Sequence, residues 1–278
     1  YGLSDYEVEA QVNDSLSFME FTGLALEDSV PDHSVISRFR TKMTNDNAYE
    51  KLLDSINQQL EAHQILIKKG CIVDASVTQT PRKPKGKKEF EVVEDRLEAS
   101  ENESTDKVTK PRAIEKTKPG VDTQAAWIKK AGKLLYGYKR HTSIEDENGL
   151  VTSVVTTAAN ESDMNHITDV VAKASFKKGT RIKADKGYQS EKNETELKQK
   201  GYRPQLMRKA VRNRALTTIE KKCNKLVSKT RYKVERTFGG MVRWFGAGKA
   251  RYVGLAKMHT QHLIESIAYN LYRTPGIA

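Results

Sequence analysis

Apolar residues recur every three or four positions through much of the first 68 residues, and this spacing predicts amphipathic helices. The first helix is expected to begin at Ser4, where Glu7 lies three positions later as in a capping box, and to end at Gly23. A second is expected from residues 31–34 onward and a third over residues 49–67. We therefore expect residues 1–68 to form an all-helical N-terminal domain.

The second of these helices has its apolar residues on one side and leaves Arg38 and Arg40 available to solvent on the other. A short helix, a turn and a basic helix form a common DNA-reading arrangement, which would make residues 1–68 a DNA-binding domain. The same pattern also occurs in helical domains that read no DNA, so both interpretations stay open at this point.

The period changes to that of β-strands after residue 65, and Asp74 stands inside the first strand among apolar neighbours. Further on, short strands alternate with helices, and Gly149 closes a hairpin turn. This order predicts an α/β domain over residues 69–274. The expected strands cover residues 66–77, 136–144, 150–157, 180–184 and 203–207, and the helices between them cover 164–176 and 191–200.

Residues 81–120 break this order. Five basic residues fall within 82–88, a mostly acidic block follows to residue 106, and the stretch from 107 to 118 mixes lysines with prolines. Segregated charge with few apolar residues cannot form a packed core. We expect a flexible, charged insertion in the α/β domain.

The clearest helical period lies near the C-terminus, where an apolar stripe predicts a long helix with that stripe buried. Glu235 lies one position off the stripe, so its carboxylate is expected at the rim where the helix meets the sheet. The stripe consists of Ile219, Cys223, Leu226, Thr230, Val234, Phe238 and Met241.

The charge of the chain is unevenly distributed. Of the net charge of +12 over 278 residues, residues 198–251 carry +15, with 17 Lys or Arg against Glu220 and Glu235 alone. A nearly single-sign stretch of this length attracts a polyanion through counterion release, which makes nucleic acid the expected partner. A basic surface that only confers solubility is the alternative.

Cysteine content and hydropathy exclude other classes. Cys71 and Cys223 are too few and too far apart for a disulfide scaffold or a cysteine-built zinc site, and we expect both to be buried, reduced thiols. No apolar run reaches the roughly 20 residues of a membrane-spanning helix. We expect a cytoplasmic protein associated with the bacterial nucleoid and no membrane partner.

Asp74, Asp185 and Glu235 are candidates for phosphodiester chemistry, because two Mg²⁺ or Mn²⁺ ions about 3.5 to 4 Å apart can stabilise both the attacking and the leaving oxygen. Such ions take oxygen ligands from a few carboxylates and keep several waters. Simpler roles exist for each residue, namely a buried ion pair for Asp74, a turn before Gly187 for Asp185, and a helical pair with Arg231 for Glu235.

Around these residues the sequence resembles the DDE transposases of bacterial insertion sequences, in particular the branch founded by insertion sequence five. The resemblance covers residues 1–274 and weakens in the insertion. Its motifs are PDHSVISRFR at 31–40, DAS at 74–76, YGYK at 136–139, AAN at 158–160, DKGY at 185–188, VERTFG at 234–239 and RYVGL at 251–255.

The resemblance implies a ribonuclease H-like catalytic core, here a mixed five-stranded sheet flanked by helices, and places Asp74, Asp185 and Glu235 at the three catalytic, metal-binding positions. It also implies cleavage at terminal inverted repeats and strand transfer into target DNA by a homodimer or larger synaptic complex. Residues expected to contact DNA are Arg38, Arg40, Lys139, Tyr188, Arg231, Lys233, Arg236 and Arg243, and Tyr188 or Trp244 would stack on a displaced base.

The sequence departs from the family signature at two positions. The family has a tyrosine seven residues before the glutamate, an arginine four before it and a lysine seven after it. Here these positions hold Ser228, Arg231 and Val242, so only the arginine matches. Lys233 or Arg243 could replace the missing contacts.

Two other functions fit part of this pattern. A non-enzymatic DNA-binding protein derived from a transposase would have a damaged triad, whereas the triad here is intact. A nuclease of the same fold would use the same metals without strand transfer. Such a nuclease would leave only breaks in a target plasmid, whereas a transposase would join the supplied end.

Overall fold

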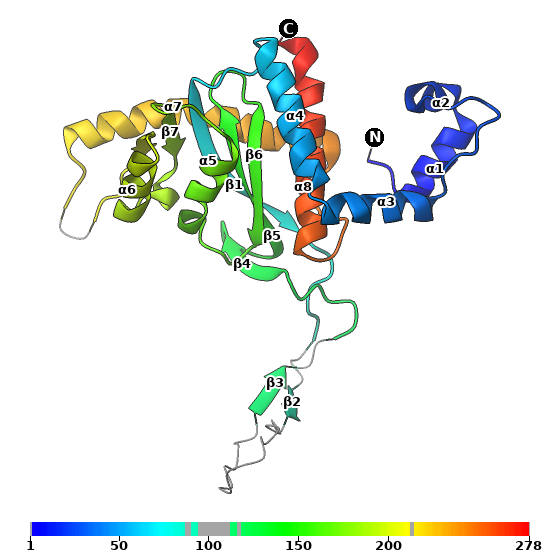
Figure 1. The fold of residues 1–278 in the computed structure, drawn as a ribbon. Helices are drawn as coiled ribbons and strands as arrows, with labels where there is room; N and C mark the ends of the chain where they lie inside the picture. The colour runs from blue at the N-terminus through cyan, green and yellow to red at the C-terminus, as the bar shows by residue number, and fades with distance from the viewer. Residues whose placement is uncertain (1, 87–89, 94–111, 116–117, 212–213, 278) are drawn as a thin grey trace, which may run out of the picture.

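The computed structural model describes residues 2–86, 90–93, 112–115, 118–211 and 214–277. Its centre is one mixed sheet in the order β4-β5-β1-β7-β8 (Figure 1). A sixth strand, β6, also pairs with β5. β1 pairs with β7 in parallel and with β5 in antiparallel fashion, and β7 pairs with β8 in parallel. The strands are β1 (Gly70–Gln79), β4 (Ala126–Lys130), β5 (Lys133–Glu145), β6 (Val151–Ala158), β7 (Arg181–Ala184) and β8 (Arg203–Leu206).

The expected mixed α/β class, a sheet flanked by helices, is therefore confirmed, with six strands in this sheet instead of five. The additional strand is β4, which pairs with the first residues of β5. This segment of five residues is too short, and alternates too weakly between apolar and polar residues, to be recognised as a strand from the sequence.

Successive residues of β1 point to opposite faces of the sheet, and helices cover both faces. Val73 packs with Ile167 of α5 (Ile167–Lys173) on one face, in the cluster that also contains Leu197 of α6 (Glu191–Gln199). Ile72 packs on the other face with α4 (Ala48–Ala62), α7 (Thr218–Phe245) and α8 (Leu255–Arg273). α4 falls within the expected N-terminal helical domain, yet its Leu53 shares this core with the sheet.

The first 45 residues form three helices that lie to one side of the body (Figure 1). The expectation of one helix between Ser4 and Gly23 is wrong, because Ser15 has an extended backbone that separates α1 (Asp5–Asp14) from α2 (Leu16–Thr22). The predicted capping box at Ser4 and the stop at Gly23 are both present. α3 (His33–Asn45) joins α4 through Asn47, whose φ of 51° turns the chain.

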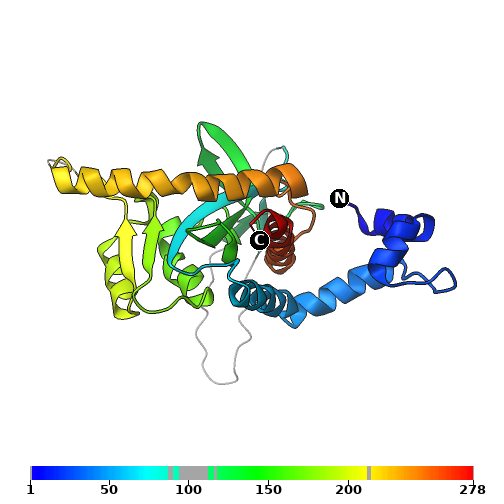
Figure 2. The ribbon, with the colours of Figure 1, turned by 90° about the horizontal axis from the view of Figure 1, so that it is seen from above.

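The long helix α7 is where expected, but the predicted apolar stripe is buried only in its second half. Val234 and Met241 lie in the core, whereas Ile219 is 74% and Leu226 is 65% exposed, and Cys223 is exposed instead of buried. The first half of α7 runs over the edge formed by the four-residue β8, beyond the apolar layer of the sheet (Figure 2). The expected continuous buried stripe is thus wrong at its N-terminal end.

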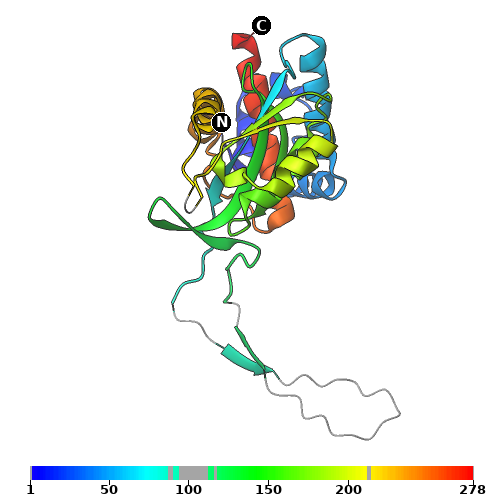
Figure 3. The ribbon, with the colours of Figure 1, turned by 90° about the vertical axis from the view of Figure 1, so that its left-hand side faces the viewer.

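The expected charged insertion at 81–120 falls largely outside the described residues. Its described part includes β2 (Phe90–Val93) and β3 (Arg112–Glu115), which pair with each other in antiparallel fashion and project away from the body (Figure 3). The remaining described elements are the short 3-10 helices η1 (Asp163–Asn165), η2 (Lys186–Tyr188) and η3 (Thr274–Gly276). Among the helices of the described residues, none has the length and apolarity that a membrane crossing needs.

Gly137 allows β5 to approach β1 closely. A Cβ atom at this position would overlap the carbonyl oxygen of Thr78 on β1. The two strands are in register here, with Gln79 opposite Gly137, so the Thr78 backbone cannot shift without loosening the pairing that continues to Asp74. The YGYK motif therefore has glycine at position 137 because a larger residue would not fit against β1.

We predict that Gly137→Ala lowers the free energy of unfolding by about 1–3 kcal/mol, the usual cost of overpacking. The midpoint of denaturant unfolding measures this change. Gly239→Ala is the matched control: Gly239 lies in α7 with open space around it, so alanine there should stabilise the helix by about 0.5–1 kcal/mol. Wild-type stability of Gly137→Ala would contradict the close approach.

Candidate active site

Asp74 and Asp185 lie side by side because of the parallel pairing between β1 and β7. Val73 is opposite Ala184 in that register, and each aspartate is the next residue of its chain. β7 ends at Ala184, so Asp185 begins the turn at the carboxyl end of the strand. Ligand sites of open α/β sheets form at such strand ends.

The Asp74 carboxylate is largely enclosed. Its side chain is 19% exposed, and one oxygen accepts a hydrogen bond of 2.8 Å from the Ala75 amide. Burial raises the pKa of Asp74, and the neighbouring Asp185 raises it further, whereas the Ala75 amide and Arg231 lower it. Burial has the largest effect, so this carboxylate is costly to ionise unless positive charge is nearby.

Arg231 of α7 supplies that positive charge and contacts both aspartates. Its Nη2 lies 3.3 Å from Oδ2 of Asp74, and its Nη1 lies 3.2 Å from Oδ1 of Asp185. The same Asp185 oxygen accepts a hydrogen bond of 2.6 Å from the Lys186 amide. The ion pair considered for Asp74 and the turn considered for Asp185 are therefore both present, and one guanidinium joins them.

Glu235 does not join this cluster. It is exposed on α7, and in the described part of the chain no three acidic, histidine or cysteine side chains are arranged to hold a metal ion. It does lie four residues after Arg231, which places the two side chains as neighbours on one flank of the helix, about 5–6 Å apart at Cβ. Ser228 and Val242, where the sequence departs from the family signature, are spaced so that they share this flank.

A second polar cluster adjoins the aspartates and was missed in the sequence. The Tyr188 hydroxyl is buried without a hydrogen-bond partner among the described residues, and burial together with Asp74, Asp163 and Asp185 raises its pKa. His141 lies 4.7 Å from His166 between ring centres, and burial lowers the pKa of His141 to about 4. No periodicity brings η1 and η2 together, so only the fold reveals this cluster.

Two residues expected to contact DNA belong to the interior instead. Tyr188 is 1% exposed and packs in the core of the α5 face, so its ring cannot stack on a displaced base without leaving that core. Lys139 is 7% exposed, and its ammonium lies 2.8 Å from Asp163 and donates to the Glu161 carbonyl. Both expectations are corrected by this burial.

The other expected DNA-contact residues lie on the surface. Lys233 donates to the carbonyl of Glu147 at 3.1 Å, and Arg236 donates to that of Asn148 at 2.8 Å, so both hold the turn between β5 and β6. Arg40 is ion paired with Asp5 and lies 5.1 Å above the Tyr252 ring. Arg38 and Arg243 are exposed, and Trp244 is 37% exposed with its ring 4.5 Å from that of Tyr272.

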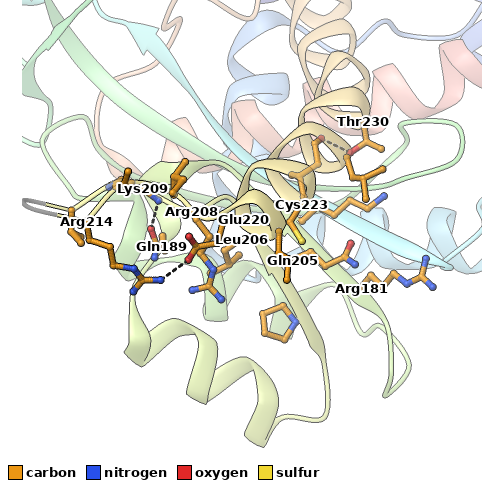
Figure 4. Close-up of a pocket in the computed structure, with 18 residues that line it drawn as sticks. Arg181, Gln189, Gln205, Leu206, Arg208, Lys209, Arg214, Glu220, Cys223 and Thr230 are labelled. Atoms are coloured by element: carbon orange, nitrogen blue, oxygen red, sulfur yellow. Dashed lines mark hydrogen bonds and ion pairs between the residues drawn. The ribbon is translucent and has the colours of Figure 1, made fainter.

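A groove lies beside the aspartates, between the outer edge of the sheet and the first half of α7 (Figure 4). Its volume is about 850 Å³. It extends from Arg214 to Thr230, the residue before Arg231. The side chains that line it are basic or apolar with few exceptions, and they include Arg181, Lys183, Arg208, Lys209 and Arg214.

Comparison with known proteins agrees with this architecture. The family described as "Transposase DDE domain" matches residues 66–271, and the "Transposase domain (DUF772)" family matches residues 1–42. The transposase for insertion sequence element IS1106 of Neisseria meningitidis serogroup B is 34% identical over 238 residues, which are 85% of this chain and 76% of that protein.

Two solved structures are similar at 8% identity. One is the piggyBac transposase synaptic complex with hairpin DNA, with a TM-score of 0.42 over 74% of this chain, which spans 46% of that one. The other is the Mos1 mariner paired end complex with Mn, with a TM-score of 0.26 over all of this chain and 79% of that one. The sequence matches decide the assignment: the chain belongs to the DDE transposase family of bacterial insertion sequences.

Proposed function

We propose that this protein is a metal-dependent DNA transposase that cleaves transposon ends and transfers them to target DNA, with Asp74, Asp185 and Glu235 as its catalytic carboxylates. The observation that carries the proposal is the pair of aspartates that share Arg231, at 3.3 and 3.2 Å. Two neighbouring carboxylates, one within β1 and one directly after β7, with the pKa of the first raised by burial and by the second, form a site that favours bound cations.

The donor set fits Mg²⁺ or Mn²⁺, which prefer oxygen ligands. Asp74 and Asp185 would hold one ion jointly, and Glu235, on the flank of α7 next to Arg231, would complete the site for a second. Two such ions supply charge stabilisation for the attacking and leaving oxygens of phosphodiester cleavage.

The residues around the carboxylates have separate tasks in this proposal. Arg231 keeps the two aspartates together and, in the DNA complex, would turn its guanidinium to a phosphate oxygen, for which its planar donor fork is well suited. Arg236 and Arg243 lie on the same half of α7 and would bind the phosphates that flank the cleaved bond. Tyr188 would act from the interior, with its hydroxyl directed at the carboxylates instead of at DNA.

The proposal also covers the partner, the active form and the domains. DNA with terminal inverted repeats is the partner, the active form contains at least two copies, and the protein acts at the nucleoid of the bacterial cytoplasm. Residues 69–274 form the catalytic domain. Within residues 1–68, α4 packs against the sheet, and the DNA-binding role belongs to α3, where Arg38 is exposed.

Asp185→Asn and Glu235→Gln are each expected to reduce Mg²⁺-dependent cleavage of a terminal-repeat duplex by about a hundredfold or more, because each removes a charged metal ligand. Gel analysis of cleavage and of strand transfer into a plasmid measures this loss. Glu220→Gln is the matched control. Glu220 is the other acid of α7, and it caps the helix start, a role that glutamine can fill.

Cleavage by Asp185→Asn at the wild-type rate would refute the metal assignment. Breaks in the plasmid without joined ends would identify a nuclease of the same fold and would refute the strand-transfer step.

Asp74→Asn is expected to stabilise the protein without divalent ions at pH 7, because asparagine removes the cost of the buried charge. Burial raises the folded-state pKa of Asp74 above its unfolded value, so the stability that protonation gives is present at acid pH and lost as pH rises through the folded pKa. The variant should therefore gain most at neutral pH and nothing below about pH 4.

Thermal unfolding with and without Mg²⁺ measures both effects. Mg²⁺ should raise the Tm of the wild type and leave that of Asp74→Asn unchanged, because ligand binding stabilises only the form that binds it. Glu235→Gln, an exposed control, should change stability without Mg²⁺ by less than about 0.5 kcal/mol. A lower stability of Asp74→Asn at pH 7 would contradict the inferred cost of the buried charge.

DNA affinity is expected to fall about a thousandfold between roughly 50 and 200 mM salt, as it does when several phosphates are neutralised. Arg236→Gln combined with Arg243→Gln should lower the slope of log affinity against log salt by about two. Lys51→Gln on α4 is the control and should leave the slope unchanged. Fluorescence anisotropy with a labelled duplex measures it, and an unchanged slope in the double variant would exclude this half of α7 as a DNA surface.

A further inference from the structure

The N-terminal helices have the opposite charge from the rest of the molecule. Residues 2–32, which we call the acidic arm, contain eight Asp or Glu and no Lys or Arg, and Arg38 is the first basic residue of the chain. Within the described residues, Asp14, Glu20 and Glu27 are exposed and form no ion pair. A DNA-binding surface of this composition would repel phosphates, so the arm fits a basic partner.

The acidic arm also exposes large apolar side chains. Phe21 is 88%, Leu26 is 77% and Leu16 is 69% exposed, all on or next to the short helix α2. Contiguous exposed apolar residues with a charged rim are typical of a surface that docks on another protein. The partner surface should therefore be basic and apolar at once.

The groove beside α7 has these two properties. Among its lining residues, Arg181 and Lys209 are exposed cations, and Ile219, Leu226 and Val211 are apolar side chains that are 74%, 65% and 59% exposed. Arg181 begins β7, and the others belong to the first half of α7 and the loop before it. The groove thus carries charge opposite to that of the acidic arm, and like the arm it exposes apolar side chains.

The arm cannot fill the groove of its own chain. The N-terminal half of α7 and β8 lie at one end of the molecule, and α1 and α2 lie at the opposite end in both views (Figures 1 and 2). α3 is fixed to the body by the hydrogen bond of 2.8 Å between Thr44 and Thr260 and by Arg40 over the Tyr252 ring. A second copy of the chain, related by a two-fold axis, would place each arm at the groove of the other.

We propose that the acidic arm of one protomer docks in the basic, apolar groove of a second protomer, so that two chains exchange arms. The inference deepens the proposed function by naming the contact that holds the dimer, but it concerns association of the protein alone. A DNA strand in the groove is the competing occupant. The described lining residues include no Phe, Tyr or Trp, the side chains on which unpaired bases stack, and this favours the arm.

This contact divides the basic residues of 198–251 between two tasks. The cations of the groove, toward the start of α7, face the partner's arm, whereas Arg236 and Arg243, toward its end, remain for DNA. Docking would bring the partner's chain within a few residues of Arg231, because Thr230 lines the groove. Dimerisation and the catalytic carboxylates would thereby be coupled through α7.

Charge reversal tests the proposal with two complementary double variants. In the arm variant, Glu20→Lys and Glu27→Lys make the arm less acidic; in the groove variant, Arg181→Glu and Lys209→Glu make the groove less basic. All four residues are exposed, so thermal unfolding should show wild-type folding. Each variant alone should self-associate about tenfold or more weakly than the wild type in sedimentation velocity without DNA, because the attraction between arm and groove is then weaker.

An equimolar mixture of the two variants should associate more strongly than either alone, since each mixed pair contains one unaltered arm in an unaltered groove, a contact that neither variant can form by itself. Phe21→Ser should weaken the dimer without any change of charge, and Asp185→Asn should dimerise like the wild type while failing to cleave. This last variant separates failure of the inference from failure of the proposed function.

Three results would overturn the proposal. The first is a wild type that stays monomeric up to about 100 µM, well above the range of stable dimers. The second is a mixture that associates no better than its components. The third is a groove variant that associates like the wild type and loses DNA affinity, which would assign the groove to DNA.

Discussion

The pairing of β1 with β7 determines the site, because it sets two carboxylates next to each other where neither is fully solvated. Asp74 and Asp185 follow residues that are directly opposite in the parallel register, so their separation is fixed by the spacing of strands. Two neighbouring carboxylates repel, and burial adds to the cost at Asp74. Arg231 offsets that cost without any ion and ties α7 to the sheet at the same point. One residue thus stabilises the aspartate pair and fixes α7 against the sheet.

Most of the fold could be predicted from the sequence because the main strands carry strand-like residue patterns and are separated by clear breaks. β1, β5, β6, β7 and β8 were all expected within a few residues of their positions. β4 was missed because five residues carry too little alternation to identify a strand. The start of α1 was predictable from Ser4 and Glu7, but the break at Ser15 was not, since the apolar period continues across it.

The site was predictable in part, and the misses share one physical cause. Acid residues inside strands are rare enough to identify Asp74, and the family motifs indicate Asp185. Exposure cannot be read from residue type, however. Tyr188 and Lys139 looked like DNA contacts but are buried, whereas the periodic positions Ile219, Cys223 and Leu226 looked like core but are exposed. Burial depends on whether another element covers a position, and β8 is too short to cover the first half of α7.

Incomplete cover is also what the acidic arm and the groove have in common. An isolated chain leaves large apolar residues exposed at both ends, with acidic charge around one group and basic charge around the other. Contiguous apolar residues on a surface are typical of a site that docks on a partner. The two halves of helix α7 therefore differ. From Arg231 to Glu235 and beyond, the helix completes the core and approaches the aspartates. Its first half exposes an apolar stripe that the same chain leaves uncovered. A helix with that division transmits the position of a docked partner to the carboxylates through its own rigid backbone, since Thr230 in the groove and Arg231 at the aspartates are consecutive residues.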